Sequence, residues 1–178
     1  MSYHILFFGM EYAENEEIVE YGALKVSTHS LTTIEEYHSF IQPSLQTINN
    51  FKERTRLTRE NLTRAYTFST IHLSLFELLN DQIWIGYNID SIHYPRLKKA
   101  CEYQNLLCPI PRQTIDTRLL WTLDFEEGKD VSLQSLGNHF GIEEQEQHLS
   151  IPDCHLNLKV FIRCGGRHIL NEFMKEGV

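Results

Sequence analysis

The residues from His4 to Glu11 form the most restrictive pattern in the chain, because four apolar side chains, Ile5 to Phe8, are followed by Gly9 and then by a carboxylate. An apolar run bounded by glycine predicts a strand that is buried on both faces, as at the centre of an α/β sheet. Glu11 then lies at the carboxyl end of the strand, where open sheets gather their ligands. Gly9 offers no ligating side chain and weakens a strand interior. This strand end is therefore the first place at which to look for chemistry.

The rest of the pattern predicts further strands and then alternating helices and strands. Strands are expected at 18–26 and 33–41, which together with the first strand make an antiparallel meander. The polar stretch 43–67 is expected to be a surface connection with at most a short helix over 58–64. Later periodicity predicts strands at 83–88 and 114–116, and helices at 69–79, 92–103, 118–123, 132–140 and from near residue 152, the last interrupted at 165–166. This order indicates one domain, residues 1–178, with a mixed sheet and helices on its faces.

Length and composition fit one globular domain and argue against a generally basic protein. The chain has 178 residues, of which 42% are hydrophobic, enough for a full core. Its formal net charge is −8, which argues against broad electrostatic attraction to nucleic acid. One group of basic residues has two interpretations, a solvated helical face or a local strip for nucleic acid: Lys52, Arg54, Arg56, Arg59 and Arg64.

The cysteines and the N-terminus indicate a reducing compartment. Cys101, Cys108, Cys154 and Cys164 show no paired CxxC spacing, so we predict buried thiols and no disulfide. The N-terminus has no Lys or Arg ahead of a short apolar run that soon becomes acidic, which fits neither a signal peptide nor a membrane span. We therefore expect a cytoplasmic or nuclear protein with no membrane partner.

Three groups of residues occur in an order that resembles a known family. They are Phe8-Gly9-Met10-Glu11, then Gly86-Tyr87-Asn88-Ile89-Asp90-Ser91-Ile92-His93, and then His148 with Asp153 five positions later. In this order and spacing, residues 4–170 resemble the DnaQ-like DEDDh family of 3′–5′ exonucleases. Ile83 to Ile89 and the pair Asn157-Leu158 are most similar to the plant NEN group. The resemblance implies a ribonuclease-H-like α/β fold, a mixed five-stranded sheet flanked by helices.

The resemblance also implies a chemistry, namely hydrolysis assisted by two divalent ions that lie about 4 Å apart. The family holds these ions with four carboxylates, because Mg²⁺ and Mn²⁺ prefer oxygen ligands, and uses a histidine as general base. Carried over by position, Glu11 is the retained glutamate, His148 the base and Asp153 the last aspartate. Gly9 and His93 stand where the other two aspartates are expected.

These two departures lead us to expect a catalytically degenerate site. Gly9 stands in place of the ligand that touches both ions, and the imidazole of His93 suits zinc, copper or iron better than magnesium. Glu11 and Asp153 are then weak metal ligands or none, and Asp90, one helical turn from His93, is a further candidate carboxylate. Two alternatives stay open. One is a metal-free site in which Glu11 is a solvated strand end and His148 a surface histidine, and the other is a transition-metal site built from Glu11, His93, His148 and Asp153.

The leading hypothesis for function is an inactive exonuclease-like domain that binds another macromolecule and needs no cofactor. Its expected partner is mainly protein, including a second copy of itself, because net acidity disfavours phosphate backbones. The first alternative is an active 3′–5′ exonuclease on single-stranded RNA or DNA that uses Mg²⁺ or Mn²⁺. The second is a protein that binds single-stranded nucleic acid without cleaving it.

Overall fold

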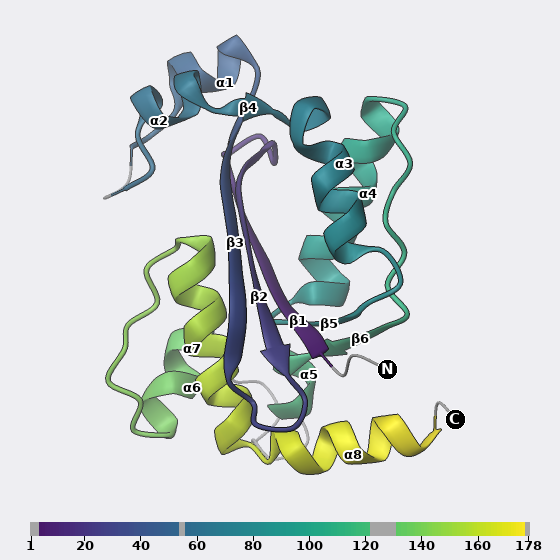
Figure 1. Ribbon diagram of the computed structural model, residues 1–178. Coiled ribbons are helices and arrows are strands. Elements are labelled where there is room, and N and C mark those ends of the chain that lie inside the picture. Colours follow the sequence, from purple (N-terminus) through teal and green to yellow (C-terminus); the bar gives the residue numbers. More distant parts are fainter. Residues whose placement is uncertain (1–3, 54–55, 122–130, 177–178) are drawn as a thin grey trace.

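A six-stranded mixed sheet forms the centre of the computed structural model, which describes residues 4–53, 56–121 and 131–176 (Figure 1). Its spatial order is β4-β3-β2-β1-β5-β6. The strands are β1 His4–Tyr12, β2 Ile18–Ser27, β3 Thr33–Gln42, β4 Tyr66–Thr67, β5 Ile83–Gly86 and β6 Gln113–Asp116. β1, β2 and β3 form the expected antiparallel meander, and β5 and β6 run parallel to β1. The α/β class and the mixed sheet are confirmed, but the expected five strands become six, because the two-residue β4 pairs with the end of β3.

Helices cover both faces of this sheet. They are α1 Leu45–Asn50, α2 Arg59–Arg64, α3 Phe68–Leu79, the π-helix η1 Ile89–His93, α4 Tyr94–Tyr103, α5 Thr117–Trp121, α6 Leu133–His139, α7 Ser150–Arg163 and α8 Gly166–Glu176. In Figure 1, α3 and α4 lie on one side of the long strands, and α6 and α7 lie on the other. Within the described ranges, no helix is both long enough and apolar enough to cross a membrane.

β1 is buried on both faces, as its apolar run predicts. Leu6, Phe8 and Met10 pack in the cluster that contains α3 and α4, whereas Ile5 and Phe7 pack in the cluster that contains α7 and α8. Because side chains alternate along a strand, an uninterrupted apolar run can serve both layers. The core therefore lies on both sides of β1 and extends along the strand to Met10, the residue before Glu11.

The segment 43–67 departs from the predicted surface connection. The helix expected over 58–64 is present as α2, but α1 and β4 were not expected. Ser44 caps α1 by accepting a hydrogen bond from the backbone N–H of Thr47. Ile48 and Phe51 are buried in a small cluster that also contains Val19 of β2 and Leu62 of α2. A few apolar side chains among polar ones are enough to anchor this segment on the sheet. The helices are too short for a helical repeat of apolar residues to show in the sequence.

The last helical segment starts and breaks close to the expected positions. α7 begins at Ser150, two residues before the expected start at residue 152. It ends at Arg163, and Gly165 adopts a left-handed conformation with φ 84° before α8 begins. The break at 165–166 is therefore confirmed. Of the helix expected over 118–123, the part up to Trp121 belongs to α5, and residues 122–123 lie outside the described ranges.

Candidate functional site

A pocket of about 230 Å³ lies where β1, η1 and the start of α7 meet. Its lining includes Gly9, Glu11, His93 and Asp153, so residues far apart in the sequence come together as their positions in the motifs predict. Asp90 is exposed and is not among the lining residues. The fold therefore collects these four motif positions at one strand end and leaves the further candidate carboxylate, Asp90, outside.

Gly9 faces Gly22 across the β1–β2 pair, and both lie under α7. A Cβ atom added at Gly22 would lie 2.7 Å from Ser150 Oγ, so only glycine lets α7 come this close to the sheet. A Cβ atom added at Gly9 would lie 3.5 Å from Cys154 Sγ, an ordinary contact distance. The backbone at Gly9 thus leaves room for the start of a side chain, although the sequence supplies none.

His93 is placed in the pocket by the π-helix η1. Asn88 starts this turn in a left-handed conformation with φ 58°, and its carbonyl accepts hydrogen bonds from the N–H groups of Ile92 at 2.9 Å and His93 at 3.2 Å. The carboxylate of Asp116 fixes the start of the turn by accepting the N–H of Asn88 at 3.0 Å. Single π-turns of this kind are frequent at functional sites because the additional residue redirects the side chains that follow.

The imidazole of His93 is held by an aromatic neighbour and lies near a cation. Its Nδ1 atom lies 2.9 Å from the hydroxyl of Tyr12, and the two rings stack with centroids 5.8 Å apart. The guanidinium of Arg96 lies 4.2 Å from the centroid of the Tyr12 ring and 3.0 Å from a carboxylate oxygen of Glu16. Burial and, to a smaller extent, the charge of Arg96 lower the pKa of His93 to about 4. His93 is therefore neutral at pH 7.

Asp153 fixes the loop that enters α7. One carboxylate oxygen accepts the backbone N–H of Gln147 at 2.8 Å, and the other accepts that of Leu149 at 3.2 Å. Burial raises the pKa of Asp153 to about 6, and the nearby charge of Glu146 adds to the increase. Both oxygens thus already have donors from the chain itself.

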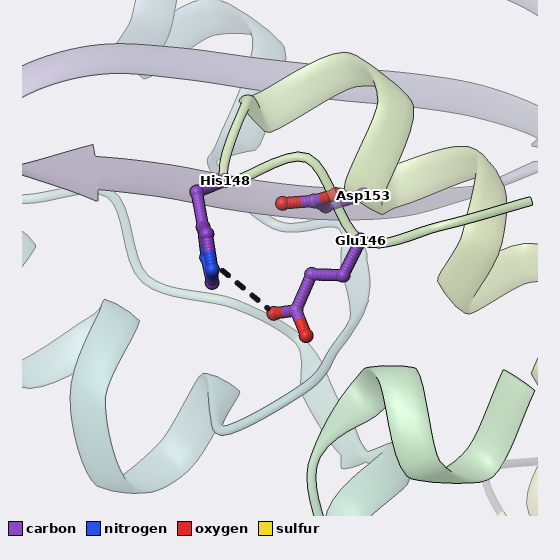
Figure 2. Close-up of side chains that lie close together, drawn as sticks. All are labelled: Glu146, His148 and Asp153. Atoms are coloured by element: carbon purple, nitrogen blue, oxygen red, sulfur yellow. Dashed lines mark ion pairs between the residues drawn. The ribbon is translucent and has the colours of Figure 1, made fainter. Parts of the chain in front are cut away.

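Figure 2 shows Glu146, His148 and Asp153 together on this loop and at the start of α7. One ligand atom from each lies within 4.8 Å of the others, so the three could hold one cation. Nδ1 of His148 lies 3.8 Å from Oε1 of Glu146, and the His148 side chain is 67% exposed. Within the described residues, neither Glu11 nor His93 belongs to this compact group.

Glu146 was not among the residues predicted from the sequence. The only sequence signal was its position two residues before His148 at the end of an acidic stretch. His148 adopts a left-handed conformation with φ 51°, and this turn brings the Glu146 carboxylate back toward Asp153. Such a turn at a non-glycine residue is not predictable from residue type.

Comparison with known proteins gives one consistent result. Residues 7–161 match the RNase_T family, described as exonuclease. Protein NEN3 of Arabidopsis thaliana is 32% identical over 169 residues, which cover 90% of this chain and 33% of NEN3. This chain therefore spans about a third of that relative's length.

Solved structures agree with the family match. One solved structure, described as 3′-end specific recognition of the histone mRNA stem-loop by a 3′-exonuclease, has a TM-score of 0.74 and 17% identity to this chain. The likeness covers 90% of this chain and 62% of that one. The nuclease domain of 3′hExo, a DEDDh family member bound to rAMP, has a TM-score of 0.71 and 16% identity, with 90% and 89% covered. At this identity the likeness establishes the fold, and the expected ribonuclease-H-like exonuclease architecture is confirmed.

Proposed function

Since the chain belongs to the RNase_T exonuclease family, we propose that it is a catalytically degenerate 3′–5′ exonuclease-like domain that binds another macromolecule, mainly protein. The observation that carries this proposal is the pair Gly9 and His93 in the lining of the pocket, where the family resemblance places two aspartates. Exonucleases of this family normally use divalent metals, and a pair of such ions needs carboxylate oxygens on opposite walls of the site. Here two of those positions supply none.

The remaining donors fit a pair of Mg²⁺ ions poorly. Glu11 and Asp153 retain carboxylates, and Asp153 already accepts two backbone N–H groups. His93 offers only nitrogen, and its Nδ1 atom is engaged with Tyr12. If an ion did bind, Glu146 and Asp153 would supply its oxygens and His148 a nitrogen, and its chemistry would be activation of a water molecule.

Protein is favoured over nucleic acid as the partner for electrostatic reasons. The formal net charge is −8, whereas binding to phosphate backbones is driven by Lys and Arg. Large apolar side chains are also exposed, including Leu73, Leu107 and Ile110. A protein partner could cover such side chains, whereas a phosphate backbone could not.

A nuclease assay with matched variants tests the loss of activity. We would incubate the full chain with labelled single-stranded RNA and DNA in Mg²⁺ or Mn²⁺, alongside Glu11→Gln and Asp153→Asn. We expect no shortening from the 3′ end in any of the three proteins. Shortening by the parent that disappears in both variants would refute the proposal, and the variants also exclude a contaminating nuclease.

A double reversion tests whether the pocket has lost only its ligands. Gly9→Asp with His93→Asp restores two carboxylates, and Gly9→Asn with His93→Asn is the matched neutral control. We expect Mg²⁺ to raise the melting temperature of the aspartate variant alone, because a cation that binds the native state stabilises it. A similar Mg²⁺ effect on the parent would show that the site is not degenerate.

The group Glu146, His148 and Asp153 favours a second candidate, an active exonuclease with a rearranged metal site. In that case cleavage would depend on Glu146, so Glu146→Gln would abolish it. The third candidate, a non-cleaving binder of single-stranded nucleic acid, predicts a salt-dependent mobility shift without digestion.

A further inference from the structure

The outer edge of β3 has backbone groups with no partner strand over most of its length. β4 pairs only with Ile41 and Gln42, and no other strand in the described part of the chain pairs with residues 33–40 on the side away from β2. Figure 1 shows β3 as the outer strand of the meander, with β4 at one end of it. Ile34 is 54% exposed, and its neighbours Glu35 and Glu36 are exposed as well. Such an edge is a template for pairing with another extended chain.

The two acidic residues of this edge do not repel a second strand strongly, because each has a partner. Oε2 of Glu35 accepts the hydroxyl of Tyr37 at 2.6 Å and lies 3.3 Å from Nζ of Lys25. Oε1 of Glu36 lies 2.7 Å from Nε2 of His155 on α7. Charged side chains often protect a sheet edge, but here Lys25 balances the charge of Glu35, and Glu36 is hydrogen-bonded to His155 within the chain. The edge is therefore available to an extended partner.

We propose that the partner is a second copy of this chain, paired antiparallel through β3 with Tyr37 on the two-fold axis. Residues at equal distances from Tyr37 then face each other, so Glu36 faces His38, Glu35 faces Ser39 and Ile34 faces Phe40 of the second copy. Opposite pairs of this kind stabilise a ladder, and the apolar pair removes the exposed Ile34 from water. The inference deepens the protein-binding part of the proposed function by naming the partner.

Neighbouring registers lack this complementarity. With the axis on Glu36, that carboxylate would face its own copy, and like charges directly opposite each other destabilise a ladder. With the axis on His38, the ladder would stop at the pair Glu36–Phe40, because the next pair, Glu35–Ile41, needs an edge that β4 occupies, so Ile34 would stay unpaired. With the axis on Tyr37, Glu36 of one copy faces His38 of the other. Glu36 contacts His155 within its own copy, and Nε2 of His38 lies 2.8 Å from Oε1 of Glu20 within its own copy. The four side chains would then form one continuous row across the interface. The side chains thus specify one register.

Disulfide trapping tests both the pairing and its register. In Tyr37→Cys the two new side chains lie across the axis with Cβ atoms about 4.5–5.5 Å apart, close enough to be bridged with a small adjustment. In Glu35→Cys the two copies of the new residue lie four positions apart along the ladder, about 13 Å, which is too far. With diamide as oxidant, we expect a covalent dimer of the 20.9 kDa chain from Tyr37→Cys and only the background of the parent from Glu35→Cys.

A mixing experiment keeps the test decisive if Tyr37→Cys folds poorly. Glu35→Cys and Ser39→Cys face each other in the proposed register, so neither should cross-link alone and a mixture of the two should. Sedimentation velocity of the parent should show a concentration-dependent shift from monomer to dimer. The inference is overturned if the parent remains a monomer into the millimolar range, or if Glu35→Cys alone cross-links as well as the mixture does.

The outcome is separable from that of the nuclease assay. A dimer that shortens RNA or DNA would refute the proposed loss of activity and leave the β3 interface intact. An inert protein that never dimerises would support the loss of activity and refute the interface.

Discussion

The close approach of α7 to the sheet predicts that Gly22→Ala destabilises the fold strongly. The added methyl group would lie 2.7 Å from Ser150 Oγ, 2.9 Å from Ser150 Cβ and 3.0 Å from the backbone nitrogen of Ile151. Because carbon atoms prefer separations of about 3.5–4.0 Å, the start of α7 must move by roughly 0.5–1 Å. Overpacking of this kind costs about 1–3 kcal/mol. The same movement lengthens the 2.8 Å hydrogen bond from Ser150 Oγ to the buried Glu20 carboxylate, whose loss adds about 1 kcal/mol or more.

We therefore expect the free energy of unfolding of Gly22→Ala to fall by about 2–4 kcal/mol. For a chain of this length, a loss of about 3 kcal/mol lowers the melting temperature by roughly 6–12 °C. Urea unfolding followed by circular dichroism and by tryptophan fluorescence measures the change directly. Coincident transitions from the two probes would support two-state unfolding, which the comparison requires.

Gly9→Ala is the matched control because Gly9 is the residue directly opposite Gly22 in the ladder. Its added methyl group would lie 3.5 Å from Cys154 Sγ, without a clash. Replacing a strand glycine by alanine then reduces the entropy of the unfolded chain, so we expect a gain of up to about 1 kcal/mol. If both variants unfold within about 0.5 kcal/mol of the parent, which is typical of unconstrained surface positions, α7 does not pack tightly on Gly22.

Three further substitutions test other parts of the pocket and core. The pKa of Asp153 is about 6 in the folded chain, above its usual value, so the folded state binds a proton more readily than the unfolded state between about pH 4 and 6. The contribution of Asp153 to stability therefore falls as pH rises through that range. In Asp153→Asn, the urea midpoint should therefore depend less on pH between about pH 4 and 7 than it does in the parent. A steeper dependence in that variant would contradict this assignment. Tyr12→Phe removes the hydroxyl that contacts His93 and should cost about 1 kcal/mol by urea unfolding, while an unchanged midpoint would mean that the contact contributes nothing. Trp84→Phe leaves a cavity and removes a buried indole N–H bond of 2.8 Å, so a loss of about 2–3 kcal/mol is expected in thermal unfolding, and a neutral result would place this side chain outside the cooperative core.

The long elements were predictable because their apolar periodicity is unambiguous. The run Ile5 to Phe8 has apolar residues on both faces, and β1 is buried on both faces. The helices α3 and α4 each repeat apolar residues at helical spacing over ten residues or more. β4 has two residues and α1 has six, too few for a period to show, and each is fixed by tertiary contacts that the sequence does not display.

The candidate site was predictable only where motif spacing determines it. Glu11, His93 and Asp153 line one pocket, as their order in the chain indicates. Glu146 was missed because its place depends on the left-handed turn at His148. The cation near His93 was also missed, since the position of Arg96 depends on its stacking against Tyr12, which residue type alone does not predict.

The π-turn at Ile89–His93 ties the contents of the pocket to the packing of the following helix. One residue more or less in this turn would rotate all of α4 by about 100°. Leu97 and Cys101, now fully buried against the sheet, would then swing toward solvent. The fold can therefore tolerate a substitution at position 93 but not a deletion or insertion there. The side chain on this wall of the pocket can change only while the number of residues in the π-turn stays the same.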